Sequence, residues 1–172
     1  MGLSLFACHQ KRAPKLWSGP SQGPDPLLKL VIANFEADRT ATRLEMIPFE
    51  REAIALVFEA IMQEQQNPRP LYFLKVSYQI PSDLLSELSG KNRQVESFEH
   101  ATISVDPDGR TATILHSRSR KKVPVVSIRF QADTTGAVFK VDWVVFDKLA
   151  GHGESGHWIL RISGEQFLLD KQ

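Results

Sequence analysis

The sequence has little of three features that would narrow its function: cysteine, excess charge and long apolar segments. Cys8 is the single cysteine among 172 residues, so an intrachain disulfide is excluded and a cysteine-based metal site would need a second subunit. With 21 Lys and Arg against 20 Asp and Glu, the net charge of +1 provides no long-range field toward nucleic acid or an anionic membrane. No apolar run reaches the ~20 residues of a membrane-spanning helix. These absences predict a soluble protein with no membrane span and no specific nucleic-acid partner.

What the sequence does contain is an ordinary globular composition. Hydrophobic residues make up 42% and charged residues 24%, which is enough apolar material for a packed core. The length favours one core with a tail over two domains. His9 to Pro26 is rich in Pro, Gly, Ser and Lys and lacks periodicity, which is typical of an extended linker. We therefore predict a disordered or tethering tail over residues 1–26 and a single α+β domain over residues 27–172.

The N-terminal segment Ser4 to Cys8 resembles the lipobox of bacterial lipoproteins, in which a small residue precedes a cysteine that is lipidated. The apolar stretch before Cys8 is shorter than the ~7–15 residues of a secretory signal, and no basic segment precedes it. We therefore expect a cytoplasmic protein. The alternative is an envelope lipoprotein tethered through Cys8, which requires that the true start of the chain lies upstream.

Two segments in the first third of the domain carry helical signals. Leu27 to Ile47 suits either a helix or a hairpin, and we favour the helix. Pro48 begins a clearer helix, because proline is tolerated in a first helical turn and Glu50 favours the positive end of the helix dipole. Asn67 to Pro70 ends it, since each proline disfavours helical geometry in the residue before it. Apolar side chains recur along this helix at i, i+3, i+4, i+7 and i+8: Ile54, Val57, Phe58, Ile61 and Met62.

Strand signals dominate from residue 71 onward. Leu71 to Ile80 indicates a strand, and Ser82 to Leu88 indicates a short helix capped by its serine. Phe98 to Val105 and Thr111 to His116 flank Asp106-Pro107-Asp108-Gly109, in which proline presets one turn dihedral and glycine accepts a positive φ. This pattern predicts a β-hairpin.

Three further strands complete the pattern. Val123 to Gln131 and Ala137 to Asp147 flank a second turn, and alternate residues of the latter strand share one apolar face: Phe139, Val141, Trp143 and Val145. His157 to Ile162 is the last predicted strand, which Gly164 ends. The sequence therefore predicts an α+β fold in which a long amphipathic helix and a short helix pack on an antiparallel sheet of about five or six strands.

This order of elements, over roughly residues 48–162, resembles the nuclear transport factor 2-like superfamily, also called cystatin-like cones. The resemblance rests on the long helix, the short helix, the Asp106-Pro107-Asp108-Gly109 hairpin and the closing strand Gly156 to Ile162 with its tryptophan. It implies that the helices lie across a curved antiparallel sheet and leave a pocket between them. Members include isomerases, dehydratases, cyclases, protein-association domains and secretion-system components, so the fold alone does not identify a function.

The concavity between helix and sheet is the predicted place of function. Its expected lining residues are Tyr78, Phe58, Trp143 and Arg129. Asp142 and His100 are the catalytic candidates, because a carboxylate that orients an imidazole can make it a general base. No enzymatic motif of the superfamily aligns residue by residue with this chain. For each polar candidate we favour an outward-facing position on a half-exposed sheet over a place in the pocket.

Two polar segments lie outside this concavity. His152 to His157 brings two imidazoles and a carboxylate within six residues, but a glycine-rich loop lacks the rigid support of zinc sites, so we predict a solvated loop. The second segment is a basic patch formed by Arg118, Arg120, Lys121 and Lys122. It could bind phosphate or an acidic protein surface, or it could be a solvated connection between strands, since it has no aromatic residue for base stacking. We predict no metal site and no cofactor.

The function that follows is a non-catalytic binding or protein-association domain. It would hold an unknown protein partner, a small apolar ligand or, as a homodimer, a second copy of the chain in the helix–sheet concavity. The alternative is a small cofactor-independent isomerase, dehydratase or hydrolase that uses an acid–base residue of the pocket.

Overall fold

The computed structural model describes residues 23–172, so Cys8 and nearly all of the predicted tail lie outside the described residues. Within the described residues the elements follow one another as α1 (Pro26–Thr40), α2 (Pro48–Glu64), β1 (Leu71–Lys75), α3 (Ser82–Leu88), β2 (Gln94–Ser97), the 3-10 helix η1 (Phe98–His100), β3 (Ala101–Val105), β4 (Ala112–His116), β5 (Val125–Ala132), β6 (Val138–Phe146), β7 (Lys148–Leu149), β8 (Glu154–Ser163) and β9 (Gln166–Lys171). No helix among these is long and apolar enough to cross a membrane.

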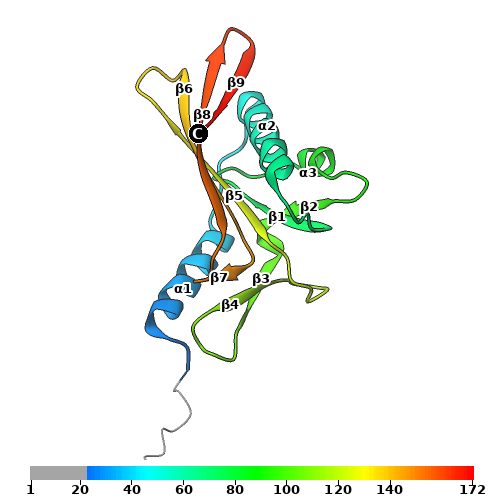
Figure 1. Ribbon diagram of the computed structural model, residues 1–172, viewed down its shortest axis with the longest axis vertical. Helices are drawn as coiled ribbons and strands as arrows, with labels where there is room; N and C mark the ends of the chain where they lie inside the picture. The colour runs from blue at the N-terminus through cyan, green and yellow to red at the C-terminus, as the bar shows by residue number, and fades with distance from the viewer. Residues whose placement is uncertain (1–22) are drawn as a thin grey trace, which may run out of the picture.

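The strands form a curled six-stranded sheet and a small three-stranded sheet, which confirms the predicted α+β class (Figure 1). The six-stranded sheet has the order β2-β1-β5-β6-β8-β9, and β3-β4-β7 form the small one. The larger sheet is mixed and not purely antiparallel, because β1 runs parallel to both β2 and β5. A parallel pair needs a long crossover, and the segment carrying α3 provides it between β1 and β2.

Helices α2 and α3 cover one face of the larger sheet, as the long and short helices were predicted to do (Figure 1). The apolar stripe of α2 is buried against the sheet, with Val57 and Phe58 both 0% exposed. The helix starts at Pro48, and the backbone N–H of Ile47 donates to the Glu50 carboxylate over 2.6 Å. This side of the sheet forms the first of two cores.

The second core lies on the other face of β1 and β5, where α1 and the small sheet pack. The helix favoured within residues 27–47 is confirmed as α1 but ends at Thr40, and residues 41–47 are not helical. The first turn of α1 is capped by Asp25 through a 2.8 Å hydrogen bond from the Leu27 N–H. Phe35 of α1 packs edge-on against Phe98, with ring centroids 5.0 Å apart. Strand β1 contributes to both cores, since Phe73 faces this one while Tyr72 and Leu74 face the first.

Both predicted hairpins are confirmed as β3–β4 and β5–β6. Strand β1 is shorter than predicted and ends at Lys75, and the strand predicted from Phe98 begins at Ala101 because η1 occupies the first three residues. Three strands were not predicted, β2, β7 and β9. Gly164 ends β8, as predicted, and forms the β8–β9 turn, with a φ of 65° that glycine adopts without strain.

Candidate functional site

The centre of the predicted concavity is filled by the first core. Phe58 is 0% exposed and Trp143 is 7% exposed. These two predicted lining residues are therefore buried within the first core and do not face an open pocket. The Trp143 ring lies across β8 at Gly156, where a Cβ would come within 2.6 Å of the indole Nε1. That Nε1 has no hydrogen-bond partner within the described residues. The open space between helix and sheet therefore lies toward the two ends of α2.

An apolar pocket of about 200 Å³ opens at the N-terminal end of α2. Tyr78, which the sequence predicted as a lining residue, does line it, and the other five come from α2 and from the β5–β6 hairpin: Phe49, Glu50, Ala53, Phe130 and Phe139. The rings of Phe49 and Phe139 have centroids 5.6 Å apart. We call this cavity the α2 pocket.

The only charge-bearing group among the residues that line the α2 pocket is the carboxylate of Glu50. Burial, followed by the hydrogen bond and charge of Glu50, raises the pKa of Tyr78. Two large apolar side chains nearby are left in solvent, Leu44 at 71% and Ile47 at 56% exposed. The backbone of Leu44 is fixed beside Tyr78 by a β-bridge and by a 2.7 Å hydrogen bond from the Gln79 N–H.

Arg129 and Asp142 lie on the opposite face of the sheet from α2, and so not in the helix–sheet concavity. Asp142 alternates along β6 with the core residues Val141 and Trp143, and its register neighbours are Arg129 on β5 and His157 on β8. His157 Nδ1 is 2.6 Å from Asp142 Oδ1, with the two side chains 79% and 41% exposed. These residues form a polar row across three strands that water reaches freely.

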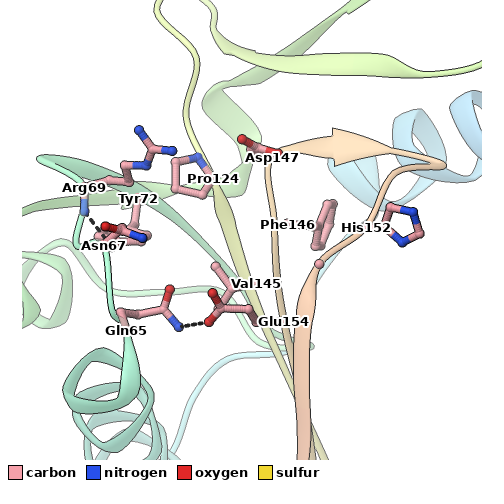
Figure 2. A pocket seen from close by; sticks show the side chains of 11 residues that line it. Gln65, Asn67, Arg69, Tyr72, Pro124, Val145, Phe146, Asp147, His152 and Glu154 are labelled. Carbon is pink, nitrogen blue, oxygen red and sulfur yellow. Dashed lines mark hydrogen bonds between the residues drawn. The ribbon is translucent and has the colours of Figure 1, made fainter.

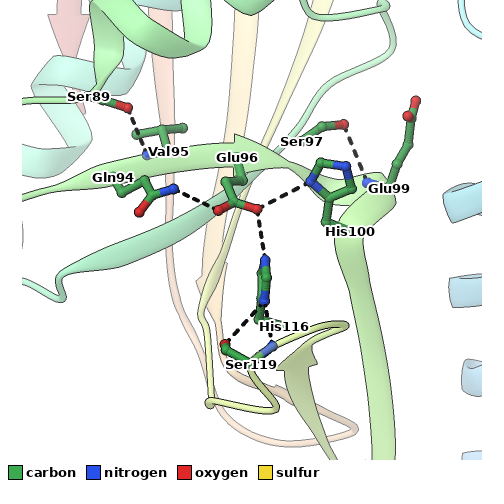
Figure 3. A network of polar contacts seen from close by, with 9 residues as sticks. All are labelled: Ser89, Gln94, Val95, Glu96, Ser97, Glu99, His100, His116 and Ser119. Carbon is green, nitrogen blue, oxygen red and sulfur yellow. Dashed lines mark hydrogen bonds and ion pairs between the residues drawn. The ribbon is translucent and has the colours of Figure 1, made fainter.

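His100 belongs to a separate network around the Glu96 carboxylate (Figure 3). His100 Nδ1 and His116 Nε2 lie 3.2 and 2.9 Å from the same oxygen of Glu96. His116 Nδ1 accepts the Ser119 N–H over 3.0 Å, so Nε2 carries the ring proton and donates it to Glu96. His100 and Asp142 therefore pair with different partners, and the structure does not bring them together as an acid–base pair.

A polar cleft of about 370 Å³ separates the C-terminal end of α2 from the loop before β8 (Figure 2). Gln65 Nε2 donates to the Glu154 carboxylate across it over 2.9 Å, and the Tyr72 hydroxyl accepts the Arg69 N–H over 2.8 Å. His152 lines this cleft while His157 pairs with Asp142, so the two histidines of the predicted loop diverge. Within residues 23–172, no group of three or more His, Cys, Asp or Glu side chains is arranged so that it could hold a metal ion.

The basic patch occupies the turn between β4 and β5, in which Arg120 has a φ of 58°. All four side chains of the basic patch are exposed, and Lys121 and Lys122 also line a further pocket together with Arg69. Sequence reasoning missed Arg69, and it also missed Phe49, Phe130 and Phe139 of the α2 pocket. The alternation that placed Phe139 on the face of Trp143 was the one usable signal, because the other contacts join segments distant in sequence.

Comparisons with protein-family models, with curated proteins and with solved structures give no match for this chain. The nuclear transport factor 2-like resemblance therefore stays a prediction.

Proposed function

We propose that this chain is a protein-association domain that receives an apolar side chain of its partner in the α2 pocket. The α2 pocket supports this proposal because it is lined by four aromatic rings and a single carboxylate. Aromatic-lined, desolvated pockets of this kind are where partner side chains contribute most of the free energy of binding.

The size of the α2 pocket favours a protein anchor over a small apolar ligand. Ligand sites usually enclose roughly 300–1,000 Å³, whereas this pocket measures about 200 Å³. That volume suits one large apolar side chain and leaves little room for a whole ligand. The remaining contact surface must then come from outside the pocket.

The exposed side chains of Leu44 and Ile47 supply such a surface. They precede α2 on a segment whose backbone is tied to residues 76–79, because Arg43 Nη1 donates to the Val76 carbonyl and the Gln79 N–H to the Leu44 carbonyl. A segment held in this way loses little conformational freedom on binding. Burying two exposed aliphatic side chains beside an anchored one is a typical interface arrangement.

The alternative hypotheses have less support. The Asp142–His157 pair has acid–base chemistry, but it stands on an open sheet face and lines none of the cavities described above. A general base works best where a substrate is held within hydrogen-bond reach of it. The lipoprotein hypothesis depends on Cys8, which lies outside the described residues, and mass spectrometry of the purified chain tests it.

The association proposal is tested by selecting peptides from a random library against the immobilised protein and measuring their affinity by fluorescence anisotropy. We expect selected peptides to share an apolar anchor and to bind the double variant Leu44→Ser, Ile47→Ser about tenfold or more weakly, because each lost aliphatic contact removes about 1.5–3 kcal/mol of burial. Leu168→Ser is the matched control, since that leucine is 50% exposed on β9.

Aromatic NMR signals of the protein show where the peptide binds. Chemical-shift changes at Phe49 and Phe139 are expected on addition of a selected peptide. Equal affinity of all three proteins for the selected peptides would contradict the proposal, and so would shifts confined to residues remote from the α2 pocket. Sedimentation of the protein alone shows whether a second copy of the chain is the partner.

A further inference from the structure

A pocket lined by three cations lies beside the turn that joins β4 to β5 and shares no lining residue with the α2 pocket. Its volume is about 270 Å³, and its charged lining residues are Arg69, Lys121, Lys122 and Asp147. The rest of the wall is apolar or proline, formed by Pro70, Leu71, Val123 and Pro124. Three positive charges and one negative charge give this pocket a local charge of +2. We call it the cationic pocket.

The three cations of the cationic pocket have no ion-pair or side-chain hydrogen-bond partner within residues 23–172. The neighbouring Arg118 and Arg120 also lack such a partner within that range but line no part of this pocket. Seven other basic side chains are each paired with a carboxylate: Arg39, Arg51, Lys75, Arg93, Lys148, Arg161 and Lys171. Like charges brought to one concave site repel one another and raise the local concentration of anions. The unsatisfied charge therefore points toward a ligand of opposite sign.

The backbone that carries these cations is held in place. The His116 N–H donates to the Lys121 carbonyl over 2.8 Å, the Arg120 N–H donates to the His116 carbonyl over 2.9 Å, and Lys122 forms a β-bridge with Leu115. Across the pocket, the Arg69 N–H donates to the Tyr72 hydroxyl. The main chain at all three cations is therefore held in place, which limits the main-chain conformational entropy that is lost when a ligand binds.

The Glu96 network strengthens this arrangement (Figure 3). The ring of His116 is stacked on Phe73 with centroids 6.0 Å apart, and its Nε2–H is oriented by Glu96. Its Nδ1 accepts from the Ser119 N–H in the middle of the basic turn. Glu96 and His116 thus connect β2 to the turn that carries Lys121 and Lys122.

We propose that the cationic pocket binds the phosphate group of a small phosphomonoester. A phosphomonoester carries a charge of about −1.5 to −2 at neutral pH, which matches the local charge of the pocket. The Arg69 guanidinium can contact two phosphate oxygens at once, and the two lysines act as point charges beside it. A carboxylate or another monoanion would leave the pocket with unbalanced positive charge.

The body of the ligand extends into the polar cleft. The polar cleft and the cationic pocket share Arg69, Pro124 and Asp147 as lining residues (Figure 2). Beyond this shared wall the cleft presents amide, carboxylate and imidazole groups from Gln65, Asn67, His152 and Glu154. Such groups hydrogen-bond hydroxyls, so the ligand class is a hydroxyl-bearing phosphomonoester.

The experiment is a titration of the full chain, followed by amide NMR, with inorganic phosphate and with glycerol 3-phosphate. Glycerol and sodium chloride at matched ionic strength serve as the uncharged and the electrostatic controls. Both phosphate probes are expected to shift the amides of Arg69, Lys121 and Lys122 saturably, and glycerol 3-phosphate also those of the polar cleft. Loss of one charge-assisted contact in Arg69→Gln or Lys122→Gln should weaken binding about tenfold or more.

Arg118→Gln is the matched control, because it removes a charge from the same basic turn without altering the cationic pocket. Unchanged affinity in Arg118→Gln beside weakened affinity in Lys122→Gln supports a defined site. Equal weakening in both variants shows diffuse attraction to the basic turn and overturns the proposal. Shifts that do not saturate, or that sodium chloride reproduces, overturn it as well.

Discussion

Asp106 is expected to be the most important charged residue for the stability of this domain. Its Oδ2 accepts from the Thr111 hydroxyl over 2.6 Å and from Lys148 Nζ over 2.9 Å, while its Oδ1 accepts from the Thr113 hydroxyl over 2.6 Å. The hydrogen bond from Lys148, followed by those from the two threonines, holds the pKa of Asp106 well below its usual range. The contacts join the β3–β4 turn to β7.

Asp106→Asn keeps the shape of the side chain but removes its charge and one acceptor. Hydrogen bonds to charged groups contribute about 1.5–3 kcal/mol each, and Thr113, at 5% exposed, would be left without a full partner. The side-chain oxygen of Asn still accepts one hydrogen bond, which limits the loss. We therefore expect the free energy of unfolding at pH 7 to decrease by about 2–3 kcal/mol. For a domain of this size that corresponds to a decrease of about 4–12 °C in Tm.

The pH dependence gives the sharper test. Because the folded pKa is depressed, the contribution of Asp106 is complete above the unfolded pKa of about 3.9 and is lost as the pH falls toward the folded pKa. The free energy of unfolding of the wild type should therefore approach that of Asp106→Asn as the pH falls. The difference should narrow by at most about 1.4 kcal/mol for each pH unit below the unfolded pKa.

Urea unfolding followed by circular dichroism at pH 7 and pH 3 measures both quantities. Asp108→Asn is the matched control from the same turn, because its Oδ1 accepts only from the N–H groups of Arg110 and Thr111 and an asparagine oxygen can do the same. The reasoning is refuted if Asp108→Asn is as destabilising as Asp106→Asn, or if the gap between wild type and Asp106→Asn is the same at both pH values.

Two further predictions concern the packing of β8 and the basic turn. Gly156→Ala places a Cβ 2.6 Å from the Trp143 ring and should lower the free energy of unfolding by about 1–3 kcal/mol. The control Gly90→Ala adds a Cβ that meets no atom within 4 Å and should leave the free energy of unfolding unchanged. Urea denaturation of the two variants measures the difference. Glu96→Ala should increase amide hydrogen exchange in residues 117–121 because it frees His116, and unchanged protection there would show that the turn needs no such support.

Local signals in the sequence were enough for most helices and for the hairpins. Asp106-Pro107-Asp108-Gly109 specifies its turn within four residues, and the apolar stripe of α2 specifies its buried face. The pairing of β1 could not be predicted in the same way, because its partners at Gln94 and Val125 are brought to it by long connections. Strand β2 is short and polar, so it has no alternation to identify it.

The candidate sites were predicted less completely, for a related reason. Tyr78 and the two lysines at positions 121 and 122 were singled out by residue type and do line cavities. Arg129 and Asp142 face away from the helix–sheet concavity, which was the outward-facing reading of the polar candidates; alternation along β6 already separates Asp142 from Trp143. Arg69 reaches its pocket only through tertiary structure.

Strand β1 also sets the order in which this chain can complete its fold during synthesis. Tyr72 and Phe73 point into different cores, so neither layer is finished until β1 is held on both edges. Its pairing with Val125 of β5 closes a loop of about 50 residues, an entropic cost that only the later contacts repay. A nascent chain that has released α2 and the β3–β4 hairpin but not β5 therefore lacks the strand that pairs with the second edge of β1, and this is the stage at which chaperones would have most to protect.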